Sequence, residues 1–298
     1  MATEARPKFA PVNYPPDPNP RKPRLKLSPG SWDTHFHAHG PSQIWPYSEG
    51  RNYTPPCAPI EHWFNLAEVL GIERGTIVQT AVQGKDTGSL FDAVQKSDGR
   101  LKAIIRADPD LDKSEVKKYH AAGVRGIRLN LVGRLHGGYD EKFFQRSVAH
   151  AVDAGWVVTM HIDTDHLVKL ADVIRKIPGN AVLDNFVMID ARPGHEEPTL
   201  SVLLDLMKEK NVWLKTAAAY RMLKKGATHE QMTAMAKKIH AASPDRTLWG
   251  TNWPHSDYFK PNQMPNDGDL VDYLADFVPD PANLKKLMVD NPKRLFDF

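Results

Sequence analysis

Short apolar runs alternate with longer segments of helical periodicity along most of this chain. Runs such as WVVTMHI are apolar with few interruptions, as is typical of strands covered on both faces. Between them, apolar residues recur on one helical face, as in residues 60–71, where Gly71 ends the segment. The predicted strands are Trp32–His37, Gly75–Thr80, Leu101–Ala107, Val124–Asn130, Trp156–Ile162, Ala181–Asn185, Val212–Ala217 and Thr247–Thr251. The predicted helices cover residues 60–71, 88–97, 112–122, 140–154, 166–176, 198–209, 229–241, 268–277 and 282–290.

This alternation predicts the architecture. Eight strands, each followed by a helix, are typical of an α/β protein with a distorted (β/α)8 TIM barrel. A doubly wound open sheet is the runner-up, but no G-x-G-x-x-G motif follows any strand, so a dinucleotide site has no support. No linker divides residues 31–298, so we expect one domain there. Residues 1–30 hold eight of the 24 prolines and predict an extended arm, either mobile or packed on a neighbouring subunit.

Composition narrows the functional classes. The 298 residues are 41% hydrophobic and 25% charged, which is ordinary for a globular protein with a sizeable core. Lys and Arg exceed Asp and Glu by only 39 to 36, too little to indicate nucleic acid as a partner. Cys57 is the single cysteine, so no internal disulfide is possible. Without a long apolar run or a signal sequence, we expect a cytoplasmic protein with no membrane partner.

Polar residues gather where the predicted strands end, which is where barrel enzymes carry their active sites. His35 and His37 are two apart on the first strand, so their side chains point to the same face. Such a pair can hold a metal or act as an acid–base and electrophilic pair. Further candidates at the strand ends are Arg128, Asn130, Arg134, His161, Asn185, Arg221, Asn252 and His255. Three arginines at one mouth would select a small acidic substrate, because guanidinium groups bind carboxylates in bidentate fashion.

Four segments carry a resemblance to a known family. DTHFHAHGP, GVRGIRLNLVGRL, WLKTAAAYRM and RTLWGTNWPH occur in that order. Together they resemble the amidohydrolase superfamily (amidohydrolase family 2), in the branch that contains 2-pyrone-4,6-dicarboxylate lactonase and galactarolactone isomerase. The resemblance implies a distorted barrel that acts on carboxylated lactones without a bound metal or other cofactor.

The resemblance also implies residue roles. The strand-1 histidines of the family match His35 and His37, and its loop tyrosine matches Tyr53. Its substrate-binding arginines match Arg128, Arg134 and Arg221.

Three positions depart from the lactonase pattern. His161 stands where the family has a tyrosine, Asn185 where it has a histidine, and Asn252 where it has an aspartate that activates water. Because an amide has no carboxylate, Asn252 cannot be a general base. The isomerase resembles this chain in reading GTNWPH, so isomerisation is nearly as strong a prediction as hydrolysis.

Three hypotheses follow. In the first, the arginines hold the carboxylates of a lactone, His35 and His37 polarise its carbonyl, Asn252 orients substrate or water, and His37, His161 or His255 moves the proton. In the second, His35, His37 and His161 bind zinc in a hydrolase or decarboxylase. In the third, the two amide substitutions mark a catalytically silent polycarboxylate-binding protein. A homodimer is possible in each case.

Overall fold

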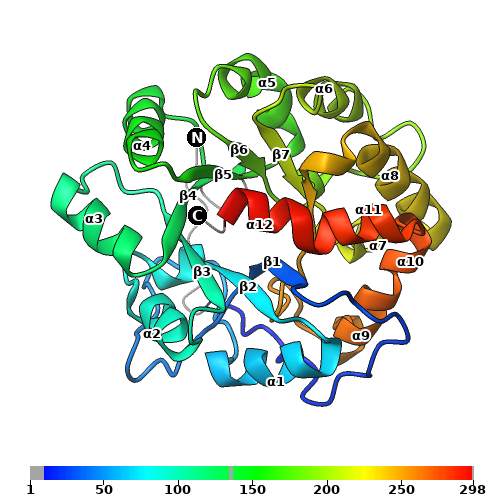
Figure 1. Cartoon of the computed structure of the whole chain (residues 1–298), viewed down its shortest axis with the longest axis horizontal. Helices are drawn as coiled ribbons and strands as arrows, with labels where there is room; N and C mark the ends of the chain where they lie inside the picture. Colours follow the sequence, from blue (N-terminus) through cyan, green and yellow to red (C-terminus); the bar gives the residue numbers. More distant parts are fainter. Residues whose placement is uncertain (1–9, 134–136, 297–298) are drawn as a thin grey trace.

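The computed structural model describes residues 10–133 and 137–296. Eight parallel strands form one sheet in sequential order, β1 to β8, with helices outside it (Figure 1). The strands are β1 (Trp32–Phe36), β2 (Arg74–Val78), β3 (Leu101–Arg106), β4 (Val124–Leu131), β5 (Val157–Ile162), β6 (Ala181–Leu183), β7 (Val212–Lys215) and β8 (Thr247–Leu248). Backbone bonds from Thr34 N to Trp249 O (2.9 Å) and from Asn252 N to His35 O (2.7 Å) join the last strand region to the first. The predicted single-domain (β/α)8 barrel is confirmed.

Helices follow the strands at close to the predicted bounds. They are α1 (Ile60–Leu70), α2 (Gly88–Lys96), α3 (Lys113–Ala121), α4 (Glu141–Asp153), α5 (Thr164–Arg175), α6 (Thr199–Leu206), α7 (Tyr220–Lys224), α8 (His229–Ala242), α9 (Asp267–Asp272), α10 (Leu274–Phe277), α11 (Pro281–Lys285) and α12 (Asn291–Phe296). The short α7 was not predicted. The segment predicted as one helix over 268–277 is split into α9 and α10. No helix in the described ranges is long and apolar enough to cross a membrane.

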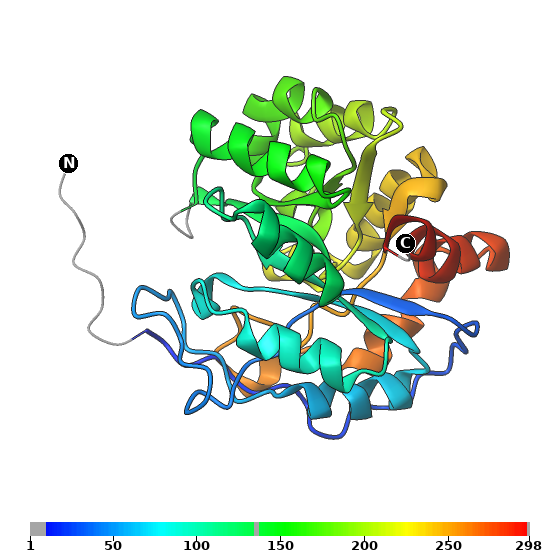
Figure 2. The ribbon, with the colours of Figure 1, turned by 60° about the vertical axis from the view of Figure 1, so that its left-hand side comes forward.

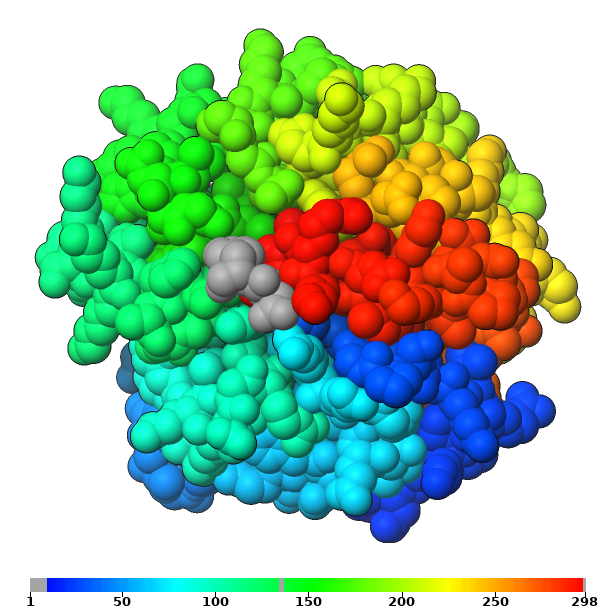
Figure 3. Space-filling view, in the orientation of Figure 1, coloured from blue at the N-terminus to red at the C-terminus, as the bar shows by residue number. Residues whose placement is uncertain are grey.

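The last helix closes one end of the barrel. In Figures 1 and 3, α12 (red) lies across the centre of the face on view. Its Leu295 and Phe296 are buried with Trp32, at the start of β1, and with Trp213 of β7. The rings of Trp32 and Phe296 are 6.1 Å apart. Because this helix covers the end where the strands begin, the opposite end, where they finish, is the one available for a site.

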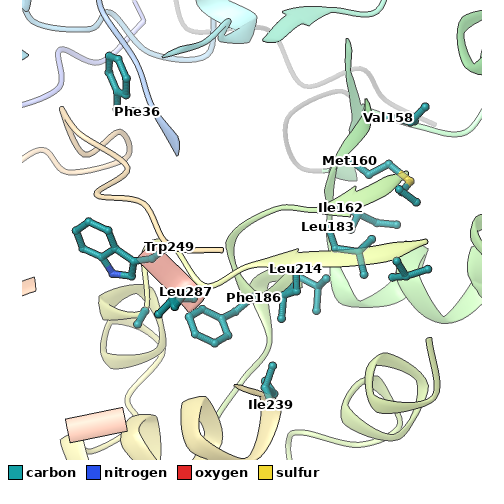
Figure 4. Close-up of a cluster of buried hydrophobic side chains, with 14 of the residues drawn as sticks. Phe36, Val158, Met160, Ile162, Leu183, Phe186, Leu214, Ile239, Trp249 and Leu287 are labelled. Atoms are coloured by element: carbon teal, nitrogen blue, oxygen red, sulfur yellow. The ribbon is translucent and has the colours of Figure 1, made fainter. Parts of the chain in front are cut away.

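Strand β5 shows how the sequence divides the core from the site. All of its residues are buried, because the barrel interior covers one face and helices cover the other. Val158, Met160 and Ile162 belong to the large cluster between sheet and helices (Figure 4). The alternation of strand side chains therefore directs Thr159 and His161 into the barrel.

The proline-rich segment before β1 lies against the chain's own barrel. Asn13 is buried, and its side chain bonds the backbone of two residues beyond β8: Nδ2 donates to His255 O (3.2 Å), and Oδ1 accepts from Tyr258 N (2.9 Å). Farther along, Arg21 forms ion pairs with Asp269 (2.5 Å) and Asp272 (2.6 Å) of α9. Figure 2 shows this blue segment passing the orange α9 region. Residues 11–14 thus hold a loop that follows β8.

Candidate active site

A small cleft opens at the carboxyl ends of the strands. Register brings its parts together: Asn130 of β4 pairs with His161 of β5. The lining residues are His37, Asn52, Tyr53, Gln79, Thr80, Ala81, Val82, Arg106, Arg128, Asn130, His161, Asn185, Arg221, Asn252 and Ser256. In the described part of the chain, this lining contains three arginines and no carboxylate. The cleft is therefore suited to an anionic ligand.

Of the ten predicted site residues within the described ranges, eight line this one cleft, and His35 and His255 do not. His35 lies below the cleft and is fully buried. His255 is also fully buried, behind the cleft wall. Arg134 lies outside the described residues. The roles given to all of these residues stay predictions.

Arg106, at the end of β3, was not among the predicted site residues. Its Nη1 donates to Gly84 O (3.0 Å), and burial together with the neighbouring Arg128 lowers its pKa. Arg128 was selected because it lies at the end of a predicted strand, and the same criterion (the strand-end rule) also selects Arg106 at the end of β3. The sequence therefore contained the information needed to predict Arg106. Asn52 and Ser256 lie in loops, where no strand pattern marks them.

A buried ionic cluster supports the floor of the cleft. Asp184 is fully buried and accepts a hydrogen bond from Arg128 Nε (2.8 Å). Its Oδ1 lies 3.4 Å from Lys215 Nζ and 3.3 Å from His35 Nδ1. Burial alone would raise the pKa of Asp184, but Lys215, His35 and Arg128 together hold it well below its usual range. The carboxylate is thus ionised and fixes Arg128 in the cleft wall.

Two histidines of the cluster region are neutral, and their hydrogen bonds indicate which nitrogen carries the proton. Burial lowers the pKa of His35 to about 3, although Asp184 opposes this. His35 Nδ1 lies 3.3 Å from Asp184 Oδ1 and 3.4 Å from Lys215 Nζ, but only the contact with the lysine has hydrogen-bond geometry. Because the lysine can only donate, we assign the hydrogen of His35 to Nε2. In His37, Nδ1 lies 2.8 Å from Val78 O, an acceptor, so Nδ1 carries the hydrogen and Nε2 keeps its lone pair.

The two rings lie close together, as the strand spacing predicts. The ring centroids of His35 and His37 are 5.0 Å apart. Burial, then His35 and Arg128, lower the pKa of His37 well below its ordinary value. His35 Nε2 can therefore donate a hydrogen bond, whereas neutral His37 Nε2 can accept one. The hypothesis that both rings polarise a carbonyl stays a prediction.

His161 faces the cleft from β5, and Asn185 faces it from the turn after β6. Burial, then Arg128, lower the pKa of His161 well below its ordinary value, and its buried Nε2 has no hydrogen-bond partner among the described residues. The Oδ1 of Asn185 is likewise buried and unpartnered within those ranges. Asn185 has φ 53°, a left-handed conformation that asparagine tolerates better than most residues. These unsatisfied polar atoms mark positions where a ligand can supply the missing bonds.

Tyr53 closes the mouth of the cleft from the loop after β1. Its hydroxyl bonds Ser256, and burial is the main cause that raises its pKa to about 12. Tyr53 is therefore a neutral hydrogen-bond donor at ordinary pH, in reach of the electrostatic field of Arg221 and Arg128. This position fits a role in holding an anionic substrate group.

The residues present do not form a zinc site of the kind considered from the sequence. Among the described residues, no group of three His, Cys, Asp or Glu side chains is placed to hold a metal ion. The bond from His37 Nδ1 to Val78 O fixes the ring and leaves Nε2 open, as in many metal-bound histidines. The case against zinc therefore rests on the placement of the three rings, not on their hydrogen bonds.

A (β/α)8 barrel with a polar cleft at its strand ends defines a class of barrel enzymes. The particular family follows from comparison: the amidohydrolase family model matches residues 32–298, and the chain belongs to that family. The resemblance inferred from the four sequence segments is confirmed.

Curated relatives cover nearly the whole chain. A 4-sulfomuconolactone hydrolase of Hydrogenophaga intermedia is 36% identical over 92% of this chain and 90% of its own length. A 2-pyrone-4,6-dicarboxylate hydrolase of Comamonas testosteroni is 31% identical, with 93% of each chain covered. A D-galactarolactone isomerase of Agrobacterium fabrum is 29% identical over 94% of this chain and 93% of its own. An apo crystal structure from Agrobacterium tumefaciens has a TM-score of 0.80 and 26% identity, and covers 93% of this chain and 98% of that one.

Proposed function

We propose that this protein is a lactonase or lactone isomerase that acts on a small lactone bearing anionic groups, without a bound metal. The observation that carries the proposal is the cleft lining, in which Arg106, Arg128 and Arg221 face one space that no carboxylate enters within the described residues. The named relatives act on lactones that carry carboxylate or sulfonate groups or on an acidic sugar lactone. Binding of one such substrate would neutralise the excess positive charge of the cleft.

The arginines differ in what holds them. Arg128 is fixed by the buried carboxylate of Asp184 at 2.8 Å, so its remaining guanidinium donors are presented in a constant direction. Arg221 Nη2 donates to Ser256 Oγ at 3.3 Å, a long bond to a neutral oxygen. We infer that Arg128 is the preorganised anchor for one anionic group and that Arg221 completes its binding when the substrate arrives. Tyr53 and Asn130 add neutral hydrogen bonds.

The neutral histidines supply the acid–base chemistry in this proposal. A water oxygen, or a hydroxyl of the substrate itself, attacks the lactone carbonyl carbon and loses its proton to His37 Nε2. The new oxyanion is stabilised by the positive charge of the arginines in the cleft lining. The tetrahedral intermediate then collapses, the bond to the ring oxygen breaks, and that oxygen takes the proton back from His37. Attack by water gives hydrolysis, and attack by the substrate hydroxyl gives a new lactone ring.

The proposal is tested with a panel of lactones that carry no, one or two anionic groups, carboxylate and sulfonate included. Protein purified with a chelator should turn over the doubly charged lactones with a kcat/KM at least tenfold above that of the neutral ones. Reaction in 18O-labelled water separates hydrolysis, which incorporates the label, from isomerisation, which does not. Equal rates on neutral and charged lactones would contradict the substrate class.

The same experiment separates the two alternatives considered from the sequence. Activity that chelation removes and zinc restores would support the metal enzyme of the second hypothesis. Calorimetric binding of a polycarboxylate with no turnover of any lactone in the panel would support the silent binding protein. Either result would overturn the proposed function.

A further inference from the structure

A chain of polar side chains runs from the cleft wall into the protein behind Asn252. Asn252 Nδ2 donates to the hydroxyl oxygen of Tyr220 at 2.8 Å. That hydroxyl lies 2.9 Å from His255 Nδ1, and His255 Nε2 lies 3.2 Å from Asp267 Oδ1. All four side chains are buried, and only Asn252 lines the cleft. These four side chains connect α7, the loop after β8 and the first residue of α9.

The directions of the two hydrogen bonds follow from the His255 end. Asp267 Oδ1 lies 3.2 Å from His255 Nε2 without hydrogen-bond geometry, but a carboxyl oxygen at that distance repels a lone pair on Nε2 and so favours a hydrogen there. With the hydrogen on Nε2, Nδ1 carries the lone pair and accepts the hydroxyl hydrogen of Tyr220. The Tyr220 oxygen in turn accepts from an N–H group, which is the Nδ2 of Asn252. The Asn252 amide is thereby turned so that its oxygen faces away from Tyr220.

We propose that Tyr220, His255 and Asp267 are positioning residues that hold Asn252 with its Oδ1 available to the substrate as a hydrogen-bond acceptor. The Oδ1 of Asn252 is buried and has no partner within the described ranges, which is the state expected of a group reserved for a ligand. This inference rests on the proposed function. It gives hydrolysis an oxygen that orients the attacking water by accepting a hydrogen bond from one of its hydrogens, while the other hydrogen goes as a proton to a histidine.

This arrangement explains how an amide is retained at a position where it cannot act as a base. An asparagine free to rotate by half a turn would present either its N–H group or its oxygen to the attacking water with little preference. The buried hydrogen bonds remove that freedom, so that only the amide oxygen of Asn252 faces the cleft. It also assigns His255, whose ring does not reach the cleft, a role that acts through Asn252.

The test compares Tyr220→Phe and Asp267→Asn with wild type and with Tyr258→Phe. Tyr258 packs against Tyr220 with ring centroids 5.7 Å apart, so it is a matched control for loss of a tyrosine hydroxyl in the same cluster. Tyr220→Phe and Asp267→Asn should lower kcat about tenfold and change KM less than about threefold, because one hydrogen bond made by the reacting hydroxyl is lost. The control should stay within about twofold of wild type.

Each variant is then combined with Asn252→Ala. If the buried residues act through Asn252, Tyr220→Phe and Asp267→Asn will have no further effect on kcat once Asn252 is gone. Multiplicative losses in the double variants would show an effect independent of Asn252 and would overturn the inference. Asp267→Asn keeps the shape of the side chain, so it provides this test even if Tyr220→Phe does not fold.

A crystallographic readout keeps this inference separate from the proposed function. If wild type turns over no lactone, the proposed function fails, but crystal structures of wild type and Tyr220→Phe still test the positioning. Neutron diffraction, which distinguishes the amide nitrogen from the oxygen, should show Asn252 Nδ2 on Tyr220 in wild type and a rotated or mixed Asn252 side chain in Tyr220→Phe. An Asn252 that is unchanged in Tyr220→Phe would overturn the positioning role.

Discussion

Replacing Arg221 and Arg128 separately by methionine should produce two different kinds of damage. Arg128 pairs with the fully buried Asp184 at 2.8 Å, and its own side chain is only 9% exposed. The guanidinium of Arg221 bonds the neutral Ser256 at 3.3 Å. Both line the cleft, so both should contribute to binding an anionic substrate. Only Arg128 also neutralises a buried charge of the protein itself.

The structure sets the size of each effect. Loss of one member of a buried, hydrogen-bonded charge pair costs about 2–4 kcal/mol, which corresponds to roughly a 30- to 700-fold loss in kcat/KM for each arginine. Breaking a buried ion pair also costs about 3–5 kcal/mol of folding free energy. Because Asp184 keeps Lys215 at 3.4 Å, we expect the lower end, about 3 kcal/mol, for Arg128→Met. That is a fall of roughly 5 °C in Tm for a chain of this length.

The assay pairs thermal unfolding with kcat/KM on an anionic lactone and on its uncharged ester. Arg221→Met should leave the free energy of unfolding within about 1 kcal/mol of wild type, while its kcat/KM falls for the anionic lactone and hardly changes for the ester. Arg128→Met should lower both stability and activity. If Arg221→Met reduces the kcat/KM for both substrates by the same factor, Arg221 does not bind the anionic group and the reasoning is refuted.

Three further outcomes are expected. Asn252→Asp restores a carboxylate able to take a proton from water, so the fraction of product labelled from 18O water should rise; an unchanged fraction would count against its contact with the attacking group. Because the pKa of His37, the proposed base, lies well below 6.5, lowered by burial and then by His35 and Arg128, the acid limb of kcat/KM should lie well below pH 6.5, with that of kcat at higher pH; coincident limbs would contradict this. Burial lowers the pKa values of His35 and His39 from 6.5 to about 3, so between these pH values the unfolded state binds more protons than the folded state. The free energy of unfolding should therefore decrease as pH falls from 6.5 to 3, which a pH titration followed by circular dichroism checks.

The periodicity of the sequence predicts the barrel well because strand and helix periods are local. It overestimates the length of the strands near the site, because β6 ends at Leu183 and β8 at Leu248, two and three residues before their predicted ends. Beyond these points the backbone leaves extended geometry, with positive φ at Asn185 and Asn252. Apolar residues occur on both sides of these ends, in AVLDNFVM and in TLWGTNWP, so hydrophobic pattern alone does not reveal where the chain turns into the cleft.

The strand-end rule predicts which side chains meet but not how deep they lie. His35 and His37 share a face of β1, as their spacing requires. His35 nevertheless lies below the floor of the cleft, whereas His37 lines its wall. Depth depends on the partners across the barrel, here Asp184 and Lys215. The contact between His255 and Asp267 was likewise beyond reach, because it depends on how α9 packs behind the barrel mouth and no periodicity carries that information.

The electrostatics of the cleft connect substrate binding to the strength of the catalytic base. After burial, the positive charge of Arg128 is the largest cause that lowers the pKa of His161, and Arg221 adds to it. Arg128 also lowers the pKa of His37. An anion bound to these arginines would cancel part of their field, so the pKa of both histidines should rise when substrate is present. The base is then weak in the empty cleft and stronger in the complex, which is why the acid limb of kcat should lie above that of kcat/KM.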